Sequence, residues 1–133
     1  MSATDALRLA DDMRATAAQI ELCIRPLVAA YGLTNKAYEA LARLQAAAGA
    51  LPLKSLVHAL RLERSQVIRC VDELERQLLV RRVRSPLDRR AATVQLTEAG
   101  QRLVLAMERG LKGPLSRLPA WPLAAMGHCL LGG

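Results

Sequence analysis

The feature that most constrains the fold is a change of hydrophobic spacing near residue 80. Before this point Val67, Val71, Leu74 and Leu78 recur at helical intervals, so residues 64–79 are expected to form a helix with one buried face. After it, residues 80–96 have strand-like ends around a Ser-Pro-Leu-Asp-Arg-Arg stretch, which predicts a β-hairpin with a polar tip. The pattern therefore predicts a mainly α protein with one small β element.

The rest of the chain has helical patterns separated by clear breaks. Gly32 and Gly49 are typical helix stops, and Thr34 is a plausible N-cap. Gly113-Pro114 is expected to interrupt the helix that Thr97 and Glu98 open. Helices are predicted at residues 4–30, 34–48, 53–60, 64–79, 97–112 and 121–131.

The order of these elements indicates an architecture. Two short helices, 53–60 and 64–79, are joined by a tight turn and followed by a basic hairpin, which is the arrangement of a winged helix-turn-helix. A length of 133 residues fits one domain over 1–133 with its own hydrophobic core. That core must be aliphatic, because the chain has no Phe.

The formal net charge of +7 predicts an anionic partner, although charge alone does not choose among DNA, RNA and a membrane surface. No segment resembles a signal peptide, and no apolar run approaches the length that spans a bilayer. The chain has three cysteines, Cys23, Cys70 and Cys129, which lie far apart in the sequence. An odd number of dispersed cysteines fits reduced thiols in a cytosol better than a disulfide framework. We therefore expect a cytoplasmic protein with no membrane partner, associated with the nucleoid when bound to DNA.

The helix at 64–79 carries a candidate reading surface opposite its apolar stripe. The N-terminal half of this outer face presents Ser65, Gln66 and Arg69. Arg can bind guanine bidentately, Gln can bind adenine, and Ser adapts to either, so the face suits the major groove of DNA. The acids Asp72, Glu73 and Glu75 lie toward the C-terminal half and would be repelled by phosphate there. Entry led by the helix N-terminus avoids this repulsion.

The hairpin is densely basic. Arginine at a protruding tip fits the narrow minor groove, where the negative potential of DNA is strongest. Asp88 is expected to pair with a neighbouring Arg and hold the shape of the loop. The hairpin arginines are Arg81, Arg82, Arg84, Arg89 and Arg90.

Three segments together resemble the MarR family of bacterial regulators. They are Leu62 to Arg82, then Ser85-Pro-Leu-Asp-Arg-Arg-Ala, then Val94-Gln-Leu-Thr-Glu-Ala-Gly-Gln. The resemblance covers residues 33–105 well and the terminal helices by pattern only. It departs from the family at Arg61 and Leu78, where Gly is common, at Glu63, where a Ser, Thr or Asp cap is usual, and at Ile68, which replaces a small polar residue.

The resemblance implies a homodimer that binds the half-sites of a pseudo-palindromic operator in double-stranded DNA. Residues 1–32 and 111–133 would be dimerisation helices, and residues 33–110 the winged lobe. It implies a repressor released by a small aromatic or lipophilic effector that binds in a cleft between the two regions. The expected DNA-binding residues are Arg64, Ser65, Gln66, Arg69, Arg84, Asp88, Arg89 and Arg90.

Other functions are less well supported by the residues. Cys23 falls on an apolar stripe, which favours a packed thiol over the reactive thiol of an oxidant-sensing regulator. The cysteines and the histidines, His58 and His128, are dispersed, so no metal site or other cofactor is expected. No phosphate loop or catalytic triad pattern indicates an enzyme. A winged-helix adaptor that binds a protein instead of an operator remains the alternative from another class.

Overall fold

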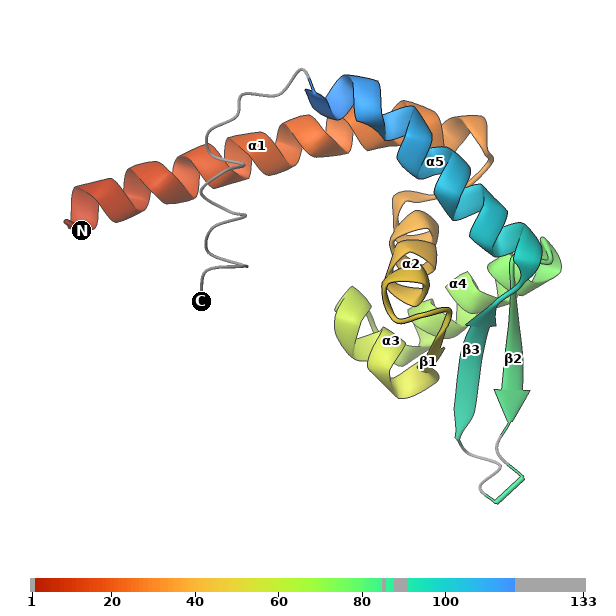
Figure 1. Ribbon diagram of the computed structural model, residues 1–133. Coiled ribbons are helices and arrows are strands. Elements are labelled where there is room, and N and C mark those ends of the chain that lie inside the picture. Colours follow the sequence, from red (N-terminus) through yellow and green to blue (C-terminus); the bar gives the residue numbers. More distant parts are fainter. Residues whose placement is uncertain (1, 85, 88–90, 117–133) are drawn as a thin grey trace. The chain divides into compact units, whose positions relative to one another are not determined.

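The structure is a computed structural model that describes residues 2–84, 86–87 and 91–116. The chain divides into two compact units. Val28–Arg109 forms the first, here called the winged unit, and the second takes the described residues 2–27 and 110–116. The elements in chain order are α1 (Ala3–Ala30), α2 (Asn35–Ala46), β1 (Ala50–Pro52), α3 (Leu53–Leu60), α4 (Arg64–Arg76), β2 (Val80–Arg84), β3 (Ala92–Leu96) and α5 (Glu98–Ser116) (Figure 1).

The winged unit contains a three-stranded antiparallel sheet in the order β1-β3-β2. The hairpin of β2 and β3 runs from the pair Val80 and Leu96 to the pair Arg84 and Ala92. β1 was not predicted; it is three residues long and pairs Leu51 with Val94 on the other side of β3. Helices α2 and α3 contact β3, and α4 contacts β2. The predicted fold, mainly helical with a small hairpin wing, is confirmed.

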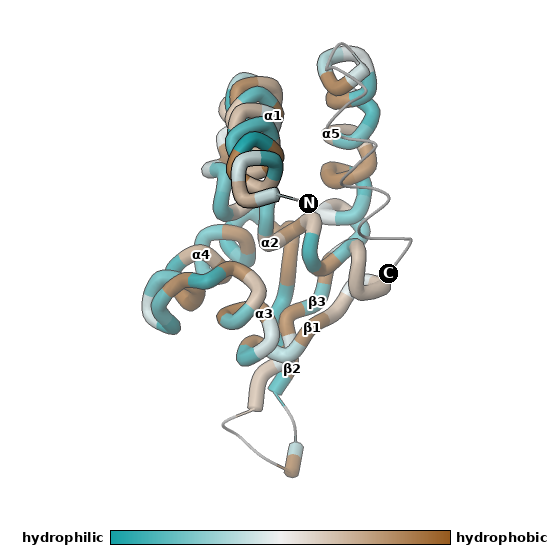
Figure 2. Tube along the Cα trace, turned by 90° about the vertical axis from the view of Figure 1, so that its left-hand side faces the viewer, coloured by the Kyte–Doolittle hydropathy of each residue, from teal (hydrophilic) through white to brown (hydrophobic). Residues whose placement is uncertain are grey.

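An aliphatic core joins these elements. Val67, Val71 and Leu74 on α4 are fully buried, which confirms the predicted stripe. The tube view shows the same alternation of apolar and polar residues along the helices of the unit (Figure 2). The other large side chains that are fully buried in the unit are Leu41 and Leu44 from α2, Leu56 and Leu60 from α3, Val80 from β2, Val94 from β3, and Val104 and Met107 from α5.

Several helix ends are formed by residues in the left-handed backbone region. Gly32 (φ +70°) and Gly49 (φ +102°) adopt it, in agreement with their predicted role as stops. Ala48, Arg61 and Leu78 also adopt it, with φ of 62°, 54° and 62°. A side chain in this region costs about 1–2 kcal/mol, so these three turns are held by surrounding contacts.

The predicted end of the helix at residue 79 is wrong. α4 ends at Arg76, and the positive φ of Leu78 turns the chain, so that Leu79 is buried while Leu78 is 73% exposed. The amide of Leu79 donates to the carbonyl of Leu74 at 3.0 Å, which closes a Schellman-type end. Leu78 therefore does not belong to the core stripe on which the sequence pattern placed it.

The start of α5 holds this corner. The hydroxyl of Thr97 donates to the carbonyl of Leu78 at 2.6 Å and accepts the amide of Gly100 at 3.1 Å. A Cβ at Gly100 would lie 2.1 Å from the carbonyl oxygen of Leu79, so only glycine fits there. The end of α4, the start of β2 and the start of α5 are thus fixed together.

Two further predictions concern the C-terminal part of the chain. The expected interruption at Gly113-Pro114 is wrong, because α5 continues through both residues to Ser116. The hydroxyl of Ser116 donates to the carbonyl of Gly113 at 2.7 Å. The helix predicted at 121–131 lies outside the described residues.

Candidate nucleic-acid interface

The N-terminus of α4 is formed by the turn that follows α3. Arg61 takes the left-handed conformation and Glu63 is the N-cap residue. The side-chain oxygen of Gln66 accepts the amide of Glu63 at 3.0 Å, which is the bond that the N3 side chain makes in a capping box. One end of the Gln66 amide group is therefore engaged in the helix start, and its NH₂ group is the part left to contact a ligand.

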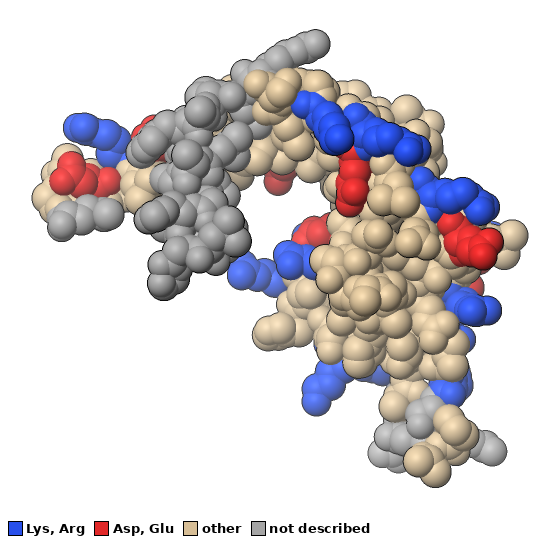
Figure 3. All heavy atoms as spheres, in the orientation of Figure 1, with Lys and Arg blue, Asp and Glu red and all other residues tan. Residues whose placement is uncertain are grey.

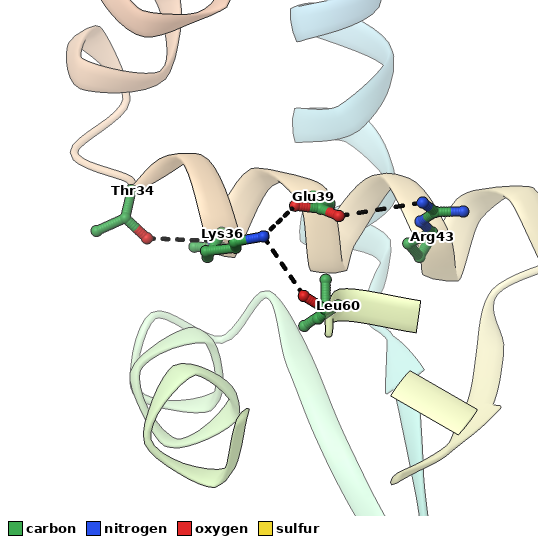
Figure 4. Close-up of polar contacts among 6 residues, drawn as sticks. Thr34, Lys36, Glu39, Arg43 and Leu60 are labelled. Carbon is green, nitrogen blue, oxygen red and sulfur yellow. Dashed lines mark hydrogen bonds and ion pairs between the residues drawn. The ribbon is translucent and has the colours of Figure 1, made fainter. Parts of the chain in front are cut away.

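Helix α2 supports the same turn from the other side (Figure 4). The ammonium of Lys36 donates to the carbonyl of Leu60, the last residue of α3, at 3.4 Å, and to Glu39 at 3.1 Å. Arg43 completes the row, 4.0 Å from Glu39. A cation at a helix C-terminus satisfies a carbonyl that has no partner within the helix. Lys36 was not identified from the sequence, since its partner lies 24 residues away.

All four residues predicted on α4 are exposed: Arg64, Ser65, Gln66 and Arg69. They share the N-terminal half of the helix, where the unpaired N–H groups create positive potential. Within the described residues no carboxylate pairs with Arg64 or Arg69. Both guanidinium groups are thus available to an anionic ligand.

Other cations of the winged unit extend this surface. In the lower part of the unit, around α3 and the strands, Lys and Arg atoms predominate strongly over acidic ones (Figure 3). The sequence pattern singled out Arg81 and Arg84, and it noted Arg61 as a departure from the family that could strain the turn or add a phosphate contact. Lys54, on α3, was missed because no motif marks it. In the part of the chain that is described, no ion pair engages Lys54, Arg61, Arg81 or Arg84, all of which are exposed.

Of the wing, the structure describes both strands and residues 86–87 between them. Arg84 is the last residue of β2, opposite Ala92, and is exposed. Leu87 is 98% exposed. The remaining predicted wing residues, Asp88, Arg89 and Arg90, lie outside the described residues.

The acids on α4 have basic partners. Glu73 lies 2.6 Å from Arg76 and accepts the side-chain amide of Gln77 at 3.1 Å. Asp72 and Glu75 both accept hydrogen bonds from the guanidinium of Arg82 on β2. The backbone N–H of Arg82 also donates to Glu75, and this bond together with the guanidinium bond holds the pKa of Glu75 below its usual value. The side-chain bond to Glu75 in turn raises the pKa of Arg82. The repulsion that the sequence predicted for this half of the helix is therefore reduced within the fold.

A groove of about 670 Å³ lies between the start of α2 and the outer face of α4. Its lining includes Leu33 and Lys36 from one side and Gln66, Arg69 and Cys70 from the other. Cys70 and Cys23 are half-buried free thiols, and Cys129 lies outside the described residues. Burial raises the pKa of the Cys70 thiol, which lowers its content of the reactive thiolate.

The described residues hold neither a candidate metal site nor a candidate membrane-spanning helix. Among residues 2–84, 86–87 and 91–116, no three His, Cys, Asp or Glu side chains gather as a metal site would require. None of the helices in this part combines the length and apolar character needed to cross a bilayer.

Comparison with known proteins agrees with this geometry. Residues 30–100 match the family model of the winged helix DNA-binding domain. No curated protein sequence matches the chain. Among solved structures, a MarR family protein from Bacillus stearothermophilus is 25% identical, with a TM-score of 0.75, and the match covers 98% of this chain and 93% of that one.

Two further structures extend the likeness. A mutant of MarR from E. coli, solved in complex with operator DNA, is 18% identical over 95% of this chain and 93% of that one, with a TM-score of 0.72. BpsR from Bordetella bronchiseptica, studied for regulation of its DNA binding by 6-hydroxynicotinic acid, is 22% identical over 92% and 96%, with a TM-score of 0.70.

The matched family model spans more than half of the chain, and the turn, recognition helix and wing of that fold are all present. The chain therefore belongs to the winged helix DNA-binding domain family. Within this class it has the fold of the MarR-family transcriptional regulators, which confirms the resemblance that the sequence motifs indicated.

Proposed function

We propose that this chain regulates transcription by binding a specific site in double-stranded DNA. The observation that carries the proposal is the N-terminal half of α4, where Arg64, Ser65 and Arg69 are exposed at the positive end of the helix. The described residues supply no carboxylate partner to either arginine. A helix of this kind enters the major groove with its N-terminus first.

Individual residues receive roles in this proposal. Arg69 binds a guanine edge or a flanking phosphate, while Arg64 and Ser65 contact the backbone or a base. The NH₂ group of Gln66 contacts a base acceptor. The wing residues Arg84, Asp88, Arg89 and Arg90 approach the adjacent minor groove, with Asp88 holding the loop.

We propose a homodimer as the binding species, with 1–32 and 111–133 as dimerisation segments and 33–110 as the winged lobe. Supporting this, α1 exposes large apolar side chains: Leu7 at 65%, Leu22 at 63% and Met13 at 37%. A second copy of the chain would cover them. Two lobes related by a dyad would read the half-sites of a pseudo-palindromic operator, spaced by about one helical turn of about 34–36 Å.

We further propose repression that a small-molecule effector relieves. The groove beside α4, which is lined by residues of the winged unit and is not the cleft between the two regions that the family resemblance implies, supports a site for such a ligand. It places apolar Leu33 and Leu62 near the cations of Lys36 and Arg69, and Asp72 and Glu73 also line it. A small aromatic acid matches this lining, and DNA binding by the similar protein BpsR is regulated by 6-hydroxynicotinic acid. A ligand there would occupy a side chain that DNA also needs, so the two would compete. We place the protein in the cytoplasm, on the nucleoid when it is bound, with no catalytic activity.

The deciding experiment is titration of the full chain with random-sequence duplex and with operator-containing duplex over a salt series. A protein that neutralises several phosphates loses affinity steeply as salt rises. We expect such a slope on both duplexes and tighter binding to the operator. A chain that binds neither duplex at low salt would be an adaptor or another protein-binding module, and the proposal would be abandoned.

A further inference from the structure

Arg82 is the one arginine of strand β2 that contacts acids of α4 in the described structure. Its guanidinium Nη2 donates to Glu75 Oε1 at 3.0 Å and also to Asp72 Oδ1. Its backbone N–H donates to the other oxygen, Glu75 Oε2, at 3.0 Å. The side chain is 29% exposed, whereas its neighbours Arg81 and Arg84 are exposed.

These bonds join the recognition helix to the wing. Asp72 and Glu75 are three residues apart on α4 and therefore lie on one side of the helix. β2 is an edge strand, so one of its outward N–H groups would otherwise lack a partner in the sheet. Glu75 supplies that partner. The acids thus serve the fold of the wing, and this function accounts for their presence on a helix that approaches DNA.

The same acids are unfavourable for DNA binding when they are unpaired. Two free carboxylates on the recognition helix would repel the phosphates that Arg64 and Arg69 attract. Arg82 places its charge against both carboxylates, so that charge is already engaged before DNA arrives. By contrast, in the described structure Arg81 and Arg84 have no acidic partner that would compete with phosphate.

We propose that Arg82 supports DNA binding indirectly, by holding Asp72 and Glu75 and offsetting part of their negative charge, and that it is not itself a phosphate contact. The inference rests on the proposed function and assigns a positioning residue within it. It predicts that Arg82 and the two acids act as one unit, whereas Arg81 acts on its own.

A pair of mutant cycles tests this with duplex affinity as the readout. The first combines Arg82→Gln with the double change Asp72→Asn and Glu75→Gln. Glutamine keeps most of the arginine stem and an amide donor, and the Glu75→Gln side chain can still accept the backbone N–H, so the fold should survive. The second cycle uses Arg81→Gln in place of Arg82→Gln as the matched control, one residue away on the same strand.

Removing the two acids should raise duplex affinity in both the wild type and the Arg82→Gln background. We expect the gain in the Arg82→Gln background to be about fivefold larger, because the effects of mutating residues in contact are not additive. The Arg81 cycle should be additive within about twofold. Thermal melting of each variant, compared with wild type, separates loss of affinity from loss of fold. Should Arg82→Gln unfold the chain, the same cycle is measured with Arg82→Met, which keeps an unbranched stem but removes the charge, and the same rescue is expected.

Three outcomes would count against the inference. Additivity in both cycles, with normal binding by the wild type, would overturn this inference and leave the proposed function intact. Equal rescue of the Arg81→Gln and Arg82→Gln variants does the same, because it would reflect only the gain of net positive charge. A wild-type chain that binds no duplex overturns the proposed function together with this inference.

Discussion

The two halves of α4 both carry charged side chains and differ in what those side chains contact. In the N-terminal half, Arg64 and Arg69 are exposed and pair with no acid of the described structure. In the C-terminal half, Glu73 pairs with Arg76 at 2.6 Å, and Asp72 and Glu75 share Arg82. One half leaves its charges available for a partner, and the other engages them within the fold.

The difference follows from how each end of the helix is built. At the N-terminus the capping contact between Glu63 and Gln66 is local, and the outward side chains of Arg64 and Arg69 form no ion pair within the described residues. At the C-terminus the chain must turn from helix into strand, and Thr97 and Gly100 hold that corner. The contacts at the C-terminus of α4 thus fix the position of the helix, while its N-terminal half stays exposed to a partner.

The largest expected difference between the halves is in DNA binding. Arg69→Ala should weaken operator binding by about 1–3 kcal/mol and change the free energy of unfolding by no more than about 0.5 kcal/mol. Arg76→Ala, on the same helix but paired with Glu73, is the matched control and should change affinity by much less. Titration of both variants on operator and random duplex across a salt series measures the effect.

The pattern of loss also assigns the contact. A base contact by Arg69 relaxes discrimination between the two duplexes, whereas a phosphate contact lowers both affinities and reduces the salt slope by about one unit. Equal effects of Arg69→Ala and Arg76→Ala would contradict the division of α4 into a reading half and a structural half.

How far the sequence predicted this arrangement depends on the range of the interactions. The buried stripe of Val67, Val71 and Leu74 was predicted because helical periodicity is local. Leu78 continues the same periodicity, yet it lies outside the helix, because the left-handed turn that places it there depends on the later residues Thr97 and Gly100. The pairing of Arg82 with Asp72 was missed for a related reason.

Asp72 and Arg82 are separated by 10 residues and a change from helix to strand, so no single repeat relates them. Strand β1 was missed likewise, because three residues ending in Pro52 become a strand only through pairing with β3. The exposure of the outer face at the start of α4 was predicted correctly, since exposure follows from the stripe. Its base contacts stay predictions, as do the wing residues Asp88, Arg89 and Arg90.

A smaller effect is expected at the fixed end of α4. Leu78→Gly should stabilise the chain by about 0.5–1 kcal/mol, because glycine adopts a φ of 62° without strain and its greater freedom when unfolded offsets only part of the gain. The midpoint of urea unfolding should rise, with DNA affinity unchanged. Ala48→Gly makes the same change at φ 62° at the end of α2 and should shift the midpoint in the same direction. A loss of stability in Leu78→Gly alone would mean that this 73% exposed side chain makes contacts that matter.

The smallest effect should appear in the pH dependence of the structural half. Hydrogen bonds from Arg82 lower the pKa of Glu75 in the folded chain below its usual value of 4.5, so folding favours the carboxylate form. The stability that Glu75 contributes is then full above about pH 4.5 and is lost as the pH falls through the lowered folded pKa. Solvent screens the pair, because Glu75 is 38% exposed, so the contribution should be modest.

Urea unfolding of wild type and Glu75→Gln should therefore differ at pH 7 and converge toward pH 3. A Glu98→Gln control, at a side chain 93% exposed, corrects for the general loss of one negative charge. A difference that persists unchanged at low pH would show that Glu75 acts by packing alone, and the C-terminal half of α4 would then lose its electrostatic distinction from the N-terminal half.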